Sequence, residues 1–237
     1  GYMRPVAEEL AKRGFRCHEP LQRRSGIAKL TVAVHVCDLQ DFMADLPGDS
    51  VVVGHSWGAM LTLCWACEHA PNSRLVLVGC GTFDTASRAE MIRILNERMD
   101  DDTKRALQKL DGIDLSDEQL AKAGRLVDDA YNFDAVEDFA ETDVDSIGYK
   151  QTWMDMLSKQ KAGVYPAAFS TISGPVTMIH GDHDPHPGST IFANLRQYIP
   201  HLEYRELSEC GHYPWRERHA REAFLGELVS ALSYAGT

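Results

Sequence analysis

The chain has 237 residues, of which 44% are hydrophobic and 25% are charged, and its 24 Lys and Arg against 35 Asp and Glu give a net charge of −11. This composition is typical of a folded domain and excludes disordered and collagen-like chains, and the negative charge argues against binding to nucleic acid. No apolar run reaches the roughly 18 residues of a membrane-spanning helix, and the first residues lack the layout of a secretory signal. The sequence therefore predicts a cytoplasmic protein without a membrane partner.

Short β-rich runs alternate with helical runs along the chain. Val51 to Val53 form a continuous apolar run, as expected for a strand that is buried on both faces. In chain order we expect helix 2–13, strand 15–19, helix 31–46, strand 50–55, helix 59–69, and strands 75–79, 176–180 and 203–207. This alternation predicts an α/β fold, with a mostly parallel five-stranded sheet flanked by helices.

The first motif with chemical meaning lies between the strand at 50–55 and the helix that follows it. Gly54-His55-Ser56-Trp57-Gly58 is G-x-S-x-G, and a strand before and a helix after are the context of a nucleophile elbow. A sharp turn there would expose the Ser56 hydroxyl at a helix N-terminus, where the Trp57 N–H can donate to an oxyanion. The alternative is an ordinary serine in a glycine-rich turn.

The next helix carries a C-x-x-C pair, Cys64 and Cys67, among six cysteines in total. Redox chemistry or half of a zinc site would use such a pair, but no second C-x-x-C follows at a suitable distance. A core of this size does not require disulfides, so we expect reduced thiols that act as small buried hydrophobes.

A long insertion separates the strand at 75–79 from the strand at 176–180. Residues 82–170 show helical periodicity, and residues 82–145 contain 18 acidic and 8 basic residues, which is nearly all of the chain's excess charge. This acidity indicates either solvated helix faces or a negative field that repels anionic substrates and tolerates amines. Asp100, Asp101, Asp102, Asp128 and Asp129 are the residues that such a field would use.

The last two strands are each followed by a loop with a catalytic residue type. Asp182 and Asp184 follow the strand at 176–180, and His212 follows the strand at 203–207. These loops and Ser56 lie at the carboxyl ends of parallel strands, where sites of open α/β sheets form. The order Ser, Asp, His is that of a hydrolase triad.

Together these segments resemble the α/β-hydrolase superfamily over nearly the whole chain. Residues 50–80, Ser-Val-Val-Val-Gly-His-Ser-Trp-Gly through Arg-Leu-Val-Leu-Val-Gly-Cys, are similar to the nucleophile segment of its esterase, C–C hydrolase and proline-iminopeptidase branches. The resemblance implies Ser56 as nucleophile, Asp184 as acid and His212 as base. It also implies a helical cap at 82–170 over a core formed by 1–81 and 171–237.

The acid has two competitors. The family's G-x-x-D pattern matches Gly181 to Asp184 and favours Asp184 over Asp182. Asp84, which follows the strand after the nucleophile, is a third and weaker candidate.

The beginning of the chain departs from the family pattern. Members have two or three strands and a His-Gly loop before the first helix, and that loop supplies the second oxyanion N–H. Gly1-Tyr2 is expected to be the remnant of that loop. Either an upstream segment precedes it, or the strands at 15–19 and 51–55 pair directly. Losing one oxyanion donor costs about 2.7–4 kcal/mol of transition-state stabilisation.

Other side chains have two interpretations each. His180, His183 and His186 have the spacing of metal ligands, but Pro185 and Pro187 break any helix that would align them, and we expect no metal or cofactor. Trp153 and Met154 in the insertion, and Trp215 after the base, are candidate substrate-binding residues. Core packing is the alternative for all three.

The sequence predicts a serine hydrolase that cleaves a small-molecule ester or amide through an acyl-enzyme. Two alternatives remain open at this point. One is a non-catalytic binding protein that keeps the triad residues without a complete oxyanion hole, and the other is an aminopeptidase for N-terminal proline. A homodimer is compatible with the sequence, which does not fix the oligomeric state.

Overall fold

The computed structural model describes residues 3–110, 114–136 and 143–233. Its centre is a parallel sheet in the order β1 (Val52–His55), β2 (Leu75–Val78), β3 (Val176–Gly181) and β4 (Glu203–Leu207). Val53 pairs with Val76 in the first ladder, and Leu77 pairs with Met178 in the second. β2 and β3 are buried along their whole length, because helices cover both faces of a parallel sheet. The predicted α/β class is confirmed.

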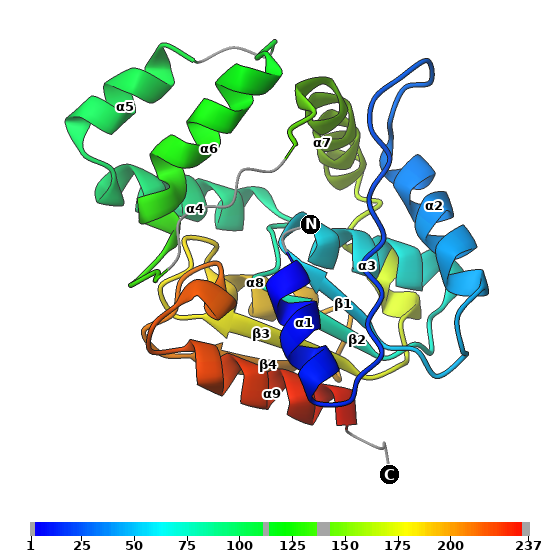
Figure 1. Cartoon of the computed structure of the whole chain (residues 1–237). Helices are drawn as coiled ribbons and strands as arrows, with labels where there is room; N and C mark the ends of the chain where they lie inside the picture. The colour runs from blue at the N-terminus through cyan, green and yellow to red at the C-terminus, as the bar shows by residue number, and fades with distance from the viewer. Residues whose placement is uncertain (1–2, 111–113, 137–142, 234–237) are drawn as a thin grey trace.

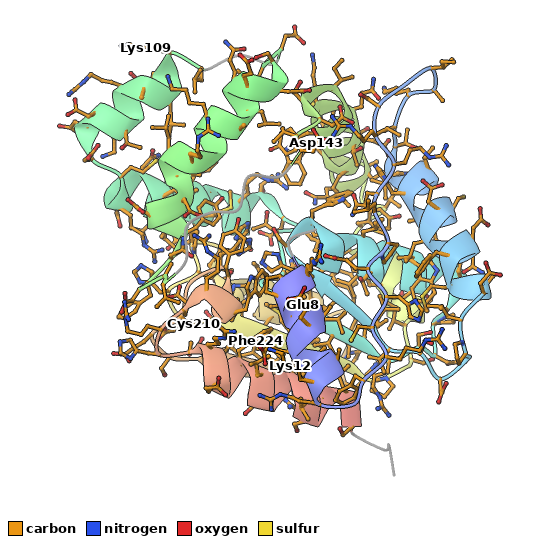
Figure 2. The ribbon with its side chains drawn as sticks, viewed as in Figure 1. Glu8, Lys12, Lys109, Asp143, Cys210 and Phe224 are labelled. Atoms are coloured by element: carbon orange, nitrogen blue, oxygen red, sulfur yellow. The ribbon has the colours of Figure 1, made fainter. Side chains whose placement is uncertain are left out.

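Helices on the two faces build two separate hydrophobic cores. One face packs under α2 (Val32–Ala44), α3 (Trp57–His69) and α8 (Gly188–Leu195), and the other under α1 (Arg4–Lys12) and α9 (Arg221–Ser233). Alternate residues of β2 serve the two cores, with Leu75 and Leu77 in the first and Val76 and Val78 in the second, as the two-residue period of a strand requires. Figure 1 shows α1 and α9 side by side on the same face, and Figure 2 shows Phe224 between α9 and the sheet.

The prediction of a strand at 15–19 is wrong. Phe15 and Cys17 are half-buried and pack against the second core. The segment has no assigned strand or bridge, however, and the direct pairing with 51–55 does not occur. A strand requires a backbone ladder to a neighbour, and side-chain packing alone leaves an extended loop.

The insertion is helical, as expected. Its helices are α4 (Thr85–Arg98), α5 (Asp101–Gln108), α6 (Asp117–Tyr131) and α7 (Ser146–Lys161), followed by the 3₁₀ turn η1 (Ala167–Thr171). α6 contacts both α4 and α5, and α7 lies against α2 (Figure 1). These helices lie between β2 and β3 in the sequence, so both ends of the insertion connect to neighbouring strands of the sheet.

Several acidic residues of the insertion have structural roles at helix N-termini. The Asp100 side chain caps α5, Asp101 and Asp102 lie in the first turn of that helix, and Asp145 caps α7. Carboxylates stabilise helix N-termini because they accept hydrogen bonds from free N–H groups and oppose the helix dipole. Asp128 forms a bidentate ion pair with Arg216, with contacts of 2.9 and 2.8 Å. These contacts give five of the 18 acidic residues at 82–145 a structural role without a substrate.

Two further expectations concern the chain as a whole. All six cysteines are free thiols, and burial raises the pKa of Cys64 and Cys67, the latter to about 12. A thiol with so high a pKa is a poor nucleophile, which fits the packing interpretation of the C-x-x-C pair. Within the described ranges, none of the helices combines the length and the hydrophobicity needed to cross a bilayer.

Candidate active site

Ser56 lies in a strained turn between β1 and α3. Its backbone has φ 54° and ψ −117°, a left-handed conformation that is rare for a residue with a side chain and typical of functional turns. The Ser56 N–H donates to the carbonyl of Val78 at 2.9 Å, which fixes the turn to the end of β2. A Cβ on Gly54 would come within 2.4 Å of the Gly58 carbonyl oxygen, so glycine is required at Gly54. A Cβ on Gly58 would meet no atom within 4 Å, so the second glycine of the motif has no such steric reason.

The residue after Ser56 begins the helix. The backbone N–H of Trp57 belongs to the first turn of α3, where N–H groups have no acceptor within the helix. The Trp57 indole is held by Gln22, whose side-chain oxygen accepts from the indole nitrogen at 3.1 Å, and by an edge contact with His35. The free N–H groups at the N-terminus of α3 therefore lie directly beside Ser56, where they can bind an anion.

Asp184 and His212 are brought together by the loops after β3 and β4. His212 Nδ1 lies 2.7 Å from Asp184 Oδ2, and both side chains are buried. The two competitors are engaged elsewhere. Asp182 is exposed and accepts from the Cys210 N–H at 3.2 Å, and Asp84 caps α4 by accepting from the Ser87 N–H at 2.8 Å.

His212 lies next to the residues that flank the serine turn. The His55 ring, one residue before Ser56, is 4.7 Å from the His212 ring, and His55 Nε2 bonds the His212 carbonyl at 2.9 Å. On the other side, a Cβ on Gly79 would come within 3.0 Å of His212 Nδ1. Gly79 directly follows Val78, the residue that accepts from Ser56. The imidazole is therefore held between the ends of β1 and β2.

The hydrogen bond to Asp184 also defines the tautomer of His212. A carboxylate can only accept, so His212 Nδ1 carries the proton and Nε2 keeps its lone pair. Burial lowers the pKa of His212 despite the opposing attraction of Asp184. Burial opposes ionisation of Asp184 as well, but His212, His180 and His186 together hold its pKa well below the usual range. The pair at neutral pH is thus a carboxylate and a neutral imidazole.

Histidines other than His212 also surround Asp184. His186 Nδ1 lies 2.9 Å from Asp184 Oδ1, and His180 Nε2 lies 3.2 Å from Oδ2. Asp184, His186 and His212 offer ligand atoms within 4.8 Å of one another, but both Nδ1 atoms are occupied by hydrogen bonds to the carboxylate. His183, the third residue of the metal hypothesis, packs its ring on Phe133 instead. We interpret the cluster as a hydrogen-bonded group around one buried charge.

Sequence reasoning missed Glu217, which joins the base loop to the insertion. Glu217 is fully buried, and its carboxylate accepts from the N–H groups of Gly211 at 2.8 Å, Phe133 at 2.8 Å and Asp134 at 2.7 Å. The His212 N–H donates to the carbonyl of Tyr131 at 2.7 Å in the same region. The only sequence signal was an acidic residue in a short polar stretch after the base. Its partners at 133–134 are over 80 residues away.

Replacing Glu217 with glutamine should lower the free energy of unfolding by about 2–3 kcal/mol, since hydrogen bonds to charged groups contribute about 1.5–3 kcal/mol. The amide nitrogen would face N–H donors that at present share a carboxylate. Urea unfolding would measure the change. Glu222→Gln on α9 is the matched control. That carboxylate is exposed, and its ion pair with Arg13 is long, at 3.9 Å, so its loss should have little effect on stability. Equal stability of the two variants would contradict this role of Glu217.

The predicted substrate-binding residues lie in two different environments. Trp153 and Met154 of α7 line a cavity of about 170 Å³, together with Leu115, Leu120, Ser146, Tyr149 and Lys150. Arg88 of α4 stacks on the Trp153 ring at 5.6 Å. Trp215 is only 5% exposed and packs between His55 and Phe224 in the second core. Trp215 thus packs against the His55 ring, which in turn contacts the His212 ring.

A serine turn after one strand of a parallel sheet, with an acid and a histidine delivered by later strands, is the architecture of an α/β hydrolase. The sequence profile of the alpha/beta hydrolase family matches residues 1–225, and the chain belongs to that family. A search among curated proteins gave no match.

Solved structures with this fold include several esterases and lipases. The chain is similar to an esterase from Exiguobacterium antarcticum, with a TM-score of 0.65 and 16% identity over 98% of this chain and 87% of that one. It is also similar to a monoacylglycerol lipase from Paleococcus ferrophilus, with a TM-score of 0.59 and 15% identity over 97% and 88%. At this identity the likeness establishes the shared fold.

Proposed function

We propose that this α/β hydrolase cleaves small esters or amides through an acyl-enzyme on Ser56. The observation that carries the proposal is the buried 2.7 Å hydrogen bond between Asp184 and His212, placed beside the strained serine turn. His212 Nε2 removes the proton from the Ser56 hydroxyl as the oxygen attacks the substrate carbonyl. Asp184 holds the imidazole in the required tautomer and stabilises its protonated form.

The rest of the cycle uses the same groups. The oxyanion forms at the N-terminus of α3, where the Trp57 N–H donates to it, and it collapses as His212 gives its proton to the leaving group. Water then enters, and His212 removes a proton from it as it attacks the acyl-enzyme. The second oxyanion collapses and releases the acid while His212 returns that proton to the Ser56 oxygen.

In this proposal the helices of residues 82–170 act as the cap. Trp153 and Met154 line an apolar cavity there, which suits an uncharged acyl or leaving group more than a charged one. Asp100, Asp101, Asp102 and Asp128 are engaged at a helix terminus or in an ion pair, so we assign these four to structure. Asp129 is exposed and is the member of the predicted negative field to which we assign no structural role.

The substrate class is tested by comparing kcat/KM for p-nitrophenyl acetate and butyrate with kcat/KM for proline p-nitroanilide. The proposal expects ester cleavage with a burst of p-nitrophenol, as an acyl-enzyme produces. A kcat/KM for the proline anilide well above those of the esters would favour the aminopeptidase. Turnover of neither class by a folded protein would contradict the proposal.

A further inference from the structure

The two oxygens of the Asp184 carboxylate are held by different histidines. Oδ2 faces His212 Nδ1 at 2.7 Å and also lies 3.2 Å from His180 Nε2. Oδ1 accepts twice from one residue, with the His186 backbone N–H and the His186 ring Nδ1 both at 2.9 Å. The Asp184 side chain has no solvent exposure, so these contacts replace the water that would otherwise solvate the charge.

His186 is itself fixed on three sides. Its carbonyl accepts from the buried His180 Nε2 at 2.9 Å, and it lies between Pro185 and Pro187, which restrict the backbone. Its ring lies 4.6 Å from the His212 ring with 26° between the planes. Because Nδ1 donates to Asp184, the free lone pair of the ring is on Nε2. His186 therefore contacts both members of the pair through defined atoms.

We propose that His186 is a positioning residue for the proposed hydrolysis, which orients the Asp184 carboxylate so that Oδ2 points at His212. This inference rests on the proposed function. The terminal torsion of an aspartate is soft, so a carboxylate held at one oxygen can rotate away from its partner. Two donors on Oδ1 resist that rotation. They also draw negative charge away from Oδ2, which limits how strongly Asp184 stabilises the protonated form of His212.

Loss of the His186 donor should have two effects that a purely structural residue would not produce together. The carboxylate becomes less well oriented, which lowers kcat. More of its charge becomes available to His212, which raises the pKa of that imidazole. The other titratable groups around the pair include His55, His180, Tyr131, Tyr204, Tyr213, Cys80, Cys210, Arg98 and Glu217, and all of these are unchanged in the variants below.

Two variants separate the donor from the ring. His186→Phe keeps an aromatic ring for stacking on His212 and removes the ring hydrogen bond, while the backbone N–H of residue 186 still donates to Oδ1. His186→Asn removes the ring, while its side-chain nitrogen can take the place of Nδ1 as donor to Asp184. The matched controls are His183→Phe and His183→Asn, since His183 lies in the same loop and its ring contacts Phe133. The measurements are kcat for a p-nitrophenyl ester as a function of pH, the His212 pKa by NMR of histidine-labelled protein, and the melting temperature.

We expect His186→Phe to lower kcat about tenfold, the equivalent of one lost hydrogen bond to a charged group, and to move the His212 pKa upward. His186→Asn should stay within about threefold of wild type, because the donor remains. The inference is overturned when His186→Phe leaves both kcat and the His212 pKa unchanged, or when His186→Asn is as impaired as His186→Phe. The NMR titration requires no turnover, so it tests His186 even if the wild-type protein hydrolyses no ester and the proposed function fails.

Discussion

Replacing Ser56 with alanine should lower kcat for ester hydrolysis on the order of 10⁵-fold or more, because the covalent route is lost with the nucleophile. The fold should survive, since the Ser56 hydroxyl lies at a turn that backbone contacts hold, such as the N–H bond to Val78. Residual turnover would come from the oxyanion site and from substrate binding alone. Steady-state kinetics on p-nitrophenyl esters would measure the effect.

Ser170→Ala is the control for this experiment. Ser170 lies exposed in η1 and donates only to a local carbonyl, that of Ala167 at 2.9 Å, so its loss should leave kcat unchanged. A Ser56→Ala variant with more than about a tenth of wild-type kcat would show that another group performs the chemistry, since triad serines contribute far more than that.

Replacing Asp184 with asparagine should lower kcat about 10⁴-fold, the effect expected when the acid can no longer fix the tautomer of the base. An amide nitrogen at the position of Oδ2 would face the protonated His212 Nδ1, and the imidazole would have to turn or move its proton to Nε2. Nε2 would then be unable to accept from Ser56. The pH profile should change along with the rate.

The neighbouring aspartates provide the comparison for Asp184. Asp182→Asn removes the charge of an exposed side chain two residues away, and Asp84→Asn keeps a good helix-capping residue at the start of α4. Both variants should stay within about threefold of wild-type kcat, since neither side chain is bonded to His212. A loss at Asp182 larger than at Asp184 would reverse the assignment of the acid.

The central strand β2 could be predicted from sequence because burial on both faces leaves a direct trace in its residues, whereas β1 is an edge strand and is mostly only partly buried. β1 and β2 contain continuous apolar runs, and the strand-turn-helix context around Ser56 gives the G-x-S-x-G motif its meaning. The helix beginning at Trp57 was predicted to start two residues later, because the apolar pattern becomes regular only at Ala59. The preference for Asp184 over Asp182 came from the family pattern.

Other features depend on contacts between distant segments that leave no local pattern. The segment at 15–19 has strand-like alternation, but whether it forms a strand depends on a backbone partner that its own residues do not specify. In the sequence Glu217 resembles an ordinary surface acid. Only the fold brings the backbone N–H groups of Phe133 and Asp134 into contact with its carboxylate. His186 was seen as one of three spaced histidines, and only the fold shows that its ring faces Asp184 and that of His183 does not.

The proposed hydrolysis requires a serine that is activated by a neutral buried imidazole. The most direct test is the rate at which an alkyl fluorophosphonate labels the protein as a function of pH, with the labelled residue identified by mass spectrometry. We expect one label per chain on Ser56 and much slower labelling in His212→Ala. The rate should be half-maximal at a pH below 6.5, because burial lowers the pKa of His212 from that ordinary value. Failure of the folded protein to label at Ser56, or an undiminished rate in His212→Ala, would contradict this mechanism.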